Sequence, residues 1–246
     1  MNVKTAGRVL DLFEAFSELQ HSASLSDIAR KLAIPVSSCF ALLRTMENRG
    51  YIYSEKARGG LYPTKRMLTL AKRIAAHDPI ANRVTPALQE LREKTEETVL
   101  FAKRAGDKVV LLDVLVSPQR IRYTAELGEQ RSLYATSLGK AILSGMSEAE
   151  RTEVLDKLDL AKLTPATITS RKKLVEELAK SAKRGWFVNS GESVQHMFGV
   201  AVPVAINGEP YAISIPGPTD RMKPNVKFLV EHLQAARDRI ERDDER

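Results

Sequence analysis

Three helical patterns followed by two short β segments occupy the first 63 residues, and this order restricts the fold more than any other feature of the chain. Apolar side chains recur at three- and four-residue steps over about 6–19 and again over about 35–50, as on the buried face of an amphipathic helix. Between them, Ser24 and Asp27 resemble a capping box that opens a helix of about two turns. The β segments, near 51–53 and 61–62, flank a basic turn. The pattern predicts a winged helix-turn-helix.

The positive charge of the chain is concentrated in the same region. The 246 residues include 38 Lys and Arg against 31 Asp and Glu, a net charge of +7. Residues 1–76 hold 12 basic and 6 acidic side chains, whereas the remaining 170 residues hold 26 and 25. Because a basic segment attracts the phosphate backbone, we expect the first part to bind double-stranded operator DNA and the nearly neutral remainder to bind something else.

The face of the third predicted helix opposite its apolar stripe is small or polar and could enter a DNA groove. The candidate DNA-binding residues are Arg8, Val36, Ser37, Ser38, Ala41, Arg44, Lys56 and Arg58. Alternatives remain open: Ser37 and Ser38 as caps of the helix, Arg44 as a solvated side chain, and the whole segment as a protein-interaction module. Phe40, beside the apolar stripe, is expected in the core.

After residue 63 the pattern changes twice. Helical spacing predicts a linker helix over about 64–77, and from residue 97 β-rich runs cover about 98–104, 108–116 and 120–127. Later segments predict helices near 136–145, 147–157 and 171–184, strands near 186–190, 198–206 and 210–215, and a helix near 222–241. We therefore predict an α+β chain with a winged helix-turn-helix at 1–63, a linker helix at 64–79 and, at 80–246, an antiparallel sheet with helices packed against it.

Several classes of protein are not indicated. No apolar run approaches the roughly 18 to 20 residues of a membrane helix, and the N-terminus has no apolar signal core, so we expect a cytoplasmic protein without a membrane partner. A single cysteine, Cys39, and four dispersed histidines argue against a metal site, and no cofactor is expected. His196, in the apolar run HMFGVAVPV, is expected to be a core or pocket-wall histidine.

One motif allows an enzymatic alternative. Ser137 precedes Lys140 at the spacing with which penicillin-recognising enzymes pair a nucleophilic serine with a lysine base. The companion motifs are absent, and a helix start capped by Thr136 or Ser137 explains the match more simply. No catalytic residue is therefore expected, and the alternative is a serine hydrolase using Ser137 and Lys140 with an accessory basic domain.

Taken together, these segments resemble the IclR family of bacterial transcriptional regulators along nearly the whole chain. The N-terminal resemblance rests on GRVLDLFEAF, LSDIARKLAIPVSSCFALLRTMENRGYI and GGLY, and the C-terminal one on LGEQRSLYATSLGKAIL, ELAKSAKRGWFVNSGES, VAVPV and AISIPGP. The resemblance implies a GAF-like effector-binding domain after the linker helix and assembly as a dimer or tetramer. It implies a ligand-responsive regulator, repressor or activator, that senses a small organic acid.

The resemblance also implies where the effector binds. Its motifs place Thr136, Ser137 and Leu138 at the pocket rim, where backbone N–H groups at a helix N-terminus can hold a carboxylate. The other effector-binding residues that it implies are Tyr123, Leu127, Asn189, Glu192, Ser214 and Pro216. For Tyr123 and Leu127, packing in the core is an equally open alternative.

The chain departs from the family pattern at two places. Ala41 stands where a basic residue is common in the recognition helix, so Arg44 or the wing is expected to compensate. His196 and Gly199 stand where many members have a glycine and a pocket cysteine, and both are kept as effector-binding candidates. With Phe198 and Tyr123 nearby, we expect an effector larger or more aromatic than a two- or three-carbon acid.

Overall fold

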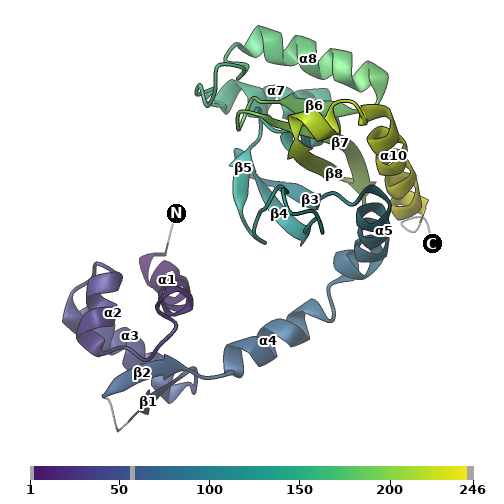
Figure 1. The fold of residues 1–246 in the computed structure, drawn as a ribbon. Coiled ribbons are helices and arrows are strands. Elements are labelled where there is room, and N and C mark those ends of the chain that lie inside the picture. The colour runs from purple at the N-terminus through teal and green to yellow at the C-terminus, as the bar shows by residue number, and fades with distance from the viewer. Residues whose placement is uncertain (1–2, 56–58, 243–246) are drawn as a thin grey trace. The chain divides into compact units, whose positions relative to one another are not determined.

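The computed structural model of the chain describes residues 3–55 and 59–242, which divide into two compact units, Met1–Asp78 and Pro79–Arg246 (Figure 1). Each unit is described by itself. None of the described helices is long and apolar enough to cross a membrane.

The first unit confirms the predicted winged helix-turn-helix. Its elements are α1 (Lys4–Leu19), α2 (Leu25–Lys31), α3 (Val36–Asn48), the antiparallel strands β1 (Ile52–Glu55) and β2 (Gly60–Pro63), and α4 (Arg66–Ala75). Leu12, Ile28 and Leu43 bring the three leading helices into one buried cluster. At the start of α2, Ser24 Oγ accepts a hydrogen bond from the Asp27 N–H and donates one to the Asp27 carboxylate, so the predicted cap is formed by that pair.

Phe40 contradicts its expected place in the core, because 52% of its surface is exposed. The buried stripe of α3 is formed by Cys39, Leu42, Leu43 and Met46. A rotation of about 100° per residue takes Phe40 off that stripe. The ring instead lines a surface cavity against the first residues of α2 and of β2.

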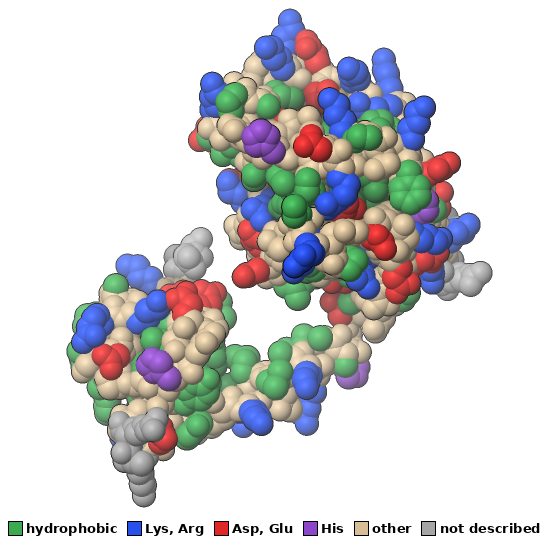
Figure 2. All heavy atoms as spheres, viewed as in Figure 1, with side chains coloured by type: hydrophobic (Ala, Val, Ile, Leu, Met, Phe, Trp, Pro, Cys, Tyr) green, Lys and Arg blue, Asp and Glu red, His purple; other side chains and the backbone are tan. Residues whose placement is uncertain are grey.

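α4 buries none of its side chains within the first unit. Met67, Leu68 and Ile74 are all exposed, Ile74 by 73%, and hydrophobic side chains gather along this helix in Figure 2. Lys72 and Arg73 stand in its last turn. The apolar side chains of this helix are therefore uncovered within its own unit, although the Arg66 guanidinium at its start lies 5.1 Å from the centroid of the Tyr51 ring.

The second unit confirms the predicted antiparallel sheet covered by helices. Its elements are α5 (Pro79–Thr95), β3 (Val99–Ala105), β4 (Lys108–Leu115), β5 (Gln130–Ser132), α6 (Ser137–Ser144), α7 (Glu148–Lys157), α8 (Arg171–Arg184), β6 (Phe187–Ser190), β7 (Met197–Ile206), β8 (Glu209–Pro218), α9 (Thr219–Met222) and α10 (Val226–Arg242). The six strands lie in the order β5-β4-β3-β8-β7-β6, and every neighbouring pair is antiparallel.

Side chains that alternate along the central strands separate two cores, one on each face of this sheet. Val200 and Val202 of β7 join the cluster that contains Leu88 of α5 and Leu233 of α10. Ala201, between those valines, joins the cluster of α6 and α8 on the opposite face. The sheet therefore lies between α5 with α10 and α6 with α8, and the start of α6 faces the sheet.

The strand predicted at 120–127 is wrong, because that segment is irregular and pairing with β4 begins later, at β5. The Tyr123 carbonyl accepts a hydrogen bond from Thr98 Oγ1 at 2.6 Å, so its partner is a side chain and not the backbone of a neighbouring strand. The two terminal apolar side chains of this β-rich run are not buried, since Ile121 and Leu127 are 74% and 67% exposed. A segment forms a strand only where a neighbouring strand leaves its hydrogen-bonding edge free. The residue types of the segment do not show whether such an edge exists.

Gly139 allows α6 to pack on the chain that precedes it. A Cβ at this position would lie 2.1 Å from the Leu133 carbonyl oxygen, a backbone atom that cannot rotate away. We expect Gly139→Ala to destabilise the second unit by about 1–3 kcal/mol, as overpacking typically does. Urea unfolding followed by the fluorescence of Trp186, the single tryptophan, measures this unit.

The matched control is Gly7→Ala in α1, where nothing lies within 4 Å of the added Cβ. That change should leave unfolding by circular dichroism unaltered or stabilise it by up to about 1 kcal/mol. A Gly139→Ala chain as stable as the wild type would contradict the packing described for α6.

Candidate functional site

The exposed face of α3 is the candidate DNA interface. Ser37, Ala41 and Arg44 are exposed, as is Val36 at 51%, while Ser38 and Arg8 are half-buried. Lys56 and Arg58 of the wing lie outside the described residues. The N-cap of α3 is Pro35, and no side chain caps the helix there, so the capping alternative for Ser37 and Ser38 is not what the structure has.

Two serine side chains and a glycine meet where the first turn of α6 touches the sheet. The Ser137 Oγ lies 2.9 Å from the Ser214 Oγ of β8, and both residues are buried. A Cβ at Gly199 of β7 would lie 2.9 Å from the same Ser137 Oγ. Thr136 caps the helix, because its Oγ1 accepts from the Gly139 N–H at 3.0 Å. The helix start is thus fixed directly over two strands.

Strand register adds two more of the predicted residues to this place. Asn189 of β6 is paired with Gly199, and Gly199 is paired in turn with Pro216 of β8. Directly paired residues present their side chains on the same face of a sheet. Ser137, Asn189, Gly199, Ser214 and Pro216 are therefore brought together, and we call this set the α6 site.

A buried ion pair borders the α6 site. Lys140, which is fully buried, donates from Nζ to Glu192 Oε1 at 2.5 Å and to the Val188 carbonyl at 3.0 Å. Burial raises the pKa of the Glu192 carboxyl, while Lys140 and, less strongly, the Ser190 N–H act to lower it. Sequence reasoning considered Lys140 only as a base, although a lysine within an apolar helix requires a buried partner.

The structure does not have the contact between Ser137 and Lys140 on which the serine hydrolase alternative depends. A nucleophilic serine needs a base within hydrogen-bonding reach. Lys140 Nζ is instead bonded to Glu192 and Val188, and Ser137 is bonded to Ser214. Within the described residues, no hydrogen bond joins Ser137 to Lys140. The arrangement fits a buried structural pair better than a catalytic dyad.

The other predicted effector residues lie apart from the α6 site or are buried in the core. Leu138 is buried on the α6 face, and Tyr123 is half-buried with the Arg131 guanidinium 5.8 Å from its ring centroid. Leu127 is exposed, so the alternative of core packing is wrong for it. His196 is also exposed, with a φ of 61°, because it occupies the turn before β7 and not the strand, and a core position for it is wrong as well.

Phe198 does not face the α6 site. It belongs to the cluster of α5 and α10, because its neighbour Gly199 is the residue that β7 turns towards α6. Phe198 therefore does not support the expected aromatic effector, and of these two rings only Tyr123 lies on the α6 face.

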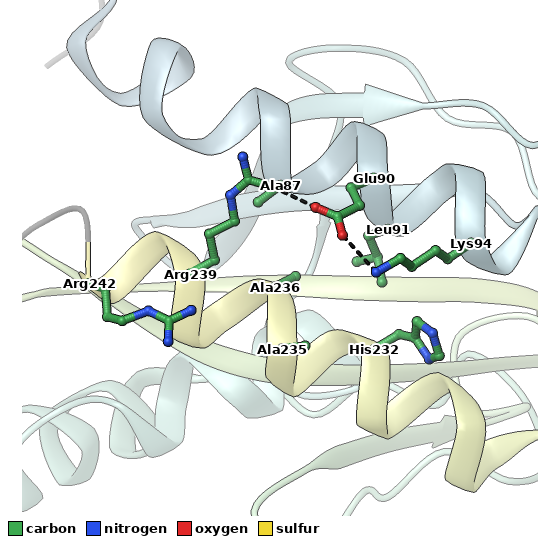
Figure 3. A pocket seen from close by; sticks show the side chains of 9 residues that line it. All are labelled: Ala87, Glu90, Leu91, Lys94, His232, Ala235, Ala236, Arg239 and Arg242. Atoms are coloured by element: carbon green, nitrogen blue, oxygen red, sulfur yellow. Dashed lines mark hydrogen bonds and ion pairs between the residues drawn. The ribbon is translucent and has the colours of Figure 1, made fainter.

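A separate groove of about 230 Å³ lies between α5 and α10 (Figure 3). Glu90 joins the two helices there, since its carboxylate accepts from Lys94 at 2.6 Å and from Arg239 at 2.5 Å. These bonds, that of Lys94 first, lower the pKa of Glu90. The groove contains none of the predicted site residues, and its one carboxylate serves to hold the helices together.

The buried pair allows a direct energetic test. We expect Lys140→Met to destabilise the second unit by about 3–5 kcal/mol, because it leaves the Glu192 carboxylate buried without its partner. Adding Glu192→Leu should restore much of that loss. Urea unfolding followed by Trp186 fluorescence measures both effects.

The control is Lys103→Met, in the exposed pair of Lys103 and Glu209, where a change of about 1 kcal/mol or less is expected. Strictly additive effects of the two core substitutions would contradict the coupling.

Family models match both units. The model of the bacterial transcriptional regulator IclR C-terminal domain matches residues 72–242, and that of the IclR helix-turn-helix domain matches residues 5–56. The chain is similar to the transcriptional repressor IclR of Escherichia coli, with 28% identity over 227 residues that cover 89% of this chain and 82% of that protein.

Solved structures agree with these matches over the whole fold. The IclR crystal structure from Thermotoga maritima has a TM-score of 0.82 at 26% identity and covers 98% of this chain and 99% of that one. An IclR homologue from Microbacterium hydrocarbonoxydans, crystallised with 4-hydroxybenzoate, has a TM-score of 0.79 at 24% identity and covers 97% of this chain and 98% of that one.

Proposed function

The chain belongs to the IclR family of bacterial transcriptional regulators, and we propose that it binds promoter DNA through α3 and changes its DNA affinity when a small organic acid occupies the α6 site. The observation that carries the proposal is the α6 site itself, where a helix N-terminus, two buried serine hydroxyls and an amide meet on one sheet face. The first unit supplies the DNA contacts, and the second responds to the acid.

The exposed face of α3 supports the DNA half of this proposal. Ser37 and Ala41 are short enough to let a groove approach the helix, and Arg44 is exposed and in no ion pair with another described residue, so it is available to a phosphate. With Ala41 in place of a basic side chain, Arg44 is the cation that α3 offers within this face. Arg8 of α1, together with Lys56 and Arg58 of the wing, completes the proposed contact set.

The α6 site supports the effector half. The first backbone N–H groups of a helix have no acceptor inside the helix, and the helix dipole favours an anion beside them. A carboxylate placed at Ser137 would accept from these groups and from a serine hydroxyl. The proposed surroundings of the acid are Asn189, Gly199, Ser214 and Pro216, with Thr136, Leu138 and Glu192 beside them. Leu127 and His196 are exposed and Tyr123 is half-buried, so these three would contact the acid only as an outer part of the set.

Self-association is the third part of the proposal. The exposed apolar side chains of α4 give the chain a surface that a second copy could cover. One helix-turn-helix contacts only a short half-site, so two copies are needed for useful specificity. An acid can then act by favouring one arrangement of the copies, as a dimer or a tetramer.

The DNA contacts are tested with Arg44→Ala. We expect at least a five-fold loss of affinity for the promoter region of the chain's own operon. The slope of log affinity against log salt concentration should become shallower by about one for each protomer bound, because each protomer loses one phosphate contact. Fluorescence anisotropy of labelled DNA at several salt concentrations measures both. Lys180→Ala, an exposed lysine of α8, removes the same charge and should change neither. Equal behaviour of the two variants would contradict the assignment of α3.

A further inference from the structure

Glu192 carries an unsatisfied hydrogen-bond acceptor in the interior of the second unit. Its Oε1 accepts from Lys140, but its Oε2 is buried and accepts no hydrogen bond of normal geometry from the part of the chain that the structure describes, the nearby Ser190 N–H included. The side chain is only 9% exposed. A buried carboxylate oxygen without a donor is unfavourable, and a ligand that supplies a donor would recover that free energy.

The loop around Glu192 holds this oxygen in place. The Glu192 N–H donates to Asn189 Oδ1 at 2.8 Å, and the Glu192 carbonyl accepts from Thr167 Oγ1 at 2.7 Å. Thr164 Oγ1 donates to the preceding carbonyl, that of Gly191, at 2.7 Å. Since backbone and side chain are both anchored, the carboxylate is preorganised and cannot turn cheaply towards another partner.

The unsatisfied oxygen belongs to the same region as the α6 site. Lys140, which binds Glu192, follows Ser137 by three residues on α6, so both side chains leave the helix on the same side. Asn189, which holds the Glu192 backbone, is paired with Gly199 beneath Ser137. Glu192 is therefore linked to the α6 site through two residues, Lys140 and Asn189.

The two ends of this region have opposite hydrogen-bonding character. Ser137 and Ser214 together have two hydroxyl hydrogens and share one hydrogen bond, so one O–H is left for an acceptor. With the first N–H groups of α6, it favours a carboxylate at that end. Glu192 repels a carboxylate and favours a donor. A bound acid is thus oriented by both ends.

We propose that Glu192 makes the α6 site selective for hydroxy acids, with the effector's hydroxyl donating to Glu192 Oε2 and its carboxylate accepting at Ser137. This inference rests on the proposed function, in which an organic acid binds there. An acid without the hydroxyl leaves the oxygen unpaired, and sites built around such a bond discriminate strongly against analogues that lack it. We expect a preference of about ten-fold or more.

Calorimetry on the full chain tests this with matched acids. The aromatic series is benzoate, 3- and 4-hydroxybenzoate, and 3- and 4-methoxybenzoate, and the aliphatic pair is propionate and lactate. In at least one series the hydroxy acid should bind about ten-fold more tightly than the unsubstituted acid. The methoxy acid should not share this gain, because its oxygen accepts but does not donate. This comparison needs the wild-type chain alone and decides the question even if a variant fails to fold.

Glu192→Gln identifies the residue responsible. The glutamine oxygen can keep the Lys140 bond, which places an NH₂ donor where Oε2 stood, so the hydroxy preference should fall to about two-fold or less. Glu209→Gln, which alters a glutamate paired with a lysine on the surface, should keep the wild-type ratio. A preference retained in Glu192→Gln would overturn the proposal.

The outcomes separate this inference from the function on which it rests. If the hydroxy, methoxy and unsubstituted acids bind the wild type with equal affinity, the role of Glu192 is overturned but an acid effector is still supported. Failure of every acid to bind overturns the acid effector and this inference together.

Discussion

The second unit depends on how closely α6 approaches the sheet. A Cβ at Gly199 of β7 would lie 2.9 Å from Ser137 Oγ, so the helix start rests on β7 with almost nothing between them. Gly139 lets α6 pack equally closely on the chain that precedes it, because a Cβ there would lie 2.1 Å from the Leu133 carbonyl oxygen. Because of these contacts, Ser137 reaches Ser214 on β8, and Lys140 reaches the Val188 carbonyl and Glu192. A larger residue at either glycine would separate the elements that form the site.

The buried Lys140–Glu192 pair contributes little to net stability, but it fixes the position of α6 relative to the loop after β6. Removing two charges from water is unfavourable, and such a pair offsets this cost only with good geometry. Lys140 has that geometry, with two acceptors, whereas Glu192 has one oxygen bonded and one unsatisfied. Under the proposed function, a ligand that reaches Glu192 would act on the bond between α6 and the loop after β6, and would thereby favour one position of that helix.

Local patterns predicted much of the fold, and the errors occur where tertiary context decides. The helices of the first unit followed from apolar periodicity, as did α6 and α8. The prediction of a strand at 120–127 was wrong because the residue types of a segment do not show which edge of a sheet is free to pair with it. Which face of the sheet Phe198 occupies could be known only from the register of β7. The sequence around His196 gave no signal that would separate its turn from the strand that follows. Lys140 and Glu192 are 52 residues apart, so no local signal pairs them.

We propose that one chain couples DNA binding in its first unit to acid binding in its second. The most direct measurement is the affinity for labelled promoter DNA with and without a saturating acid, together with the affinity for that acid with and without the DNA. Each ligand should change the affinity for the other by the same factor, several-fold or more, as linkage requires. An acid that binds tightly and leaves the DNA affinity unchanged would contradict it.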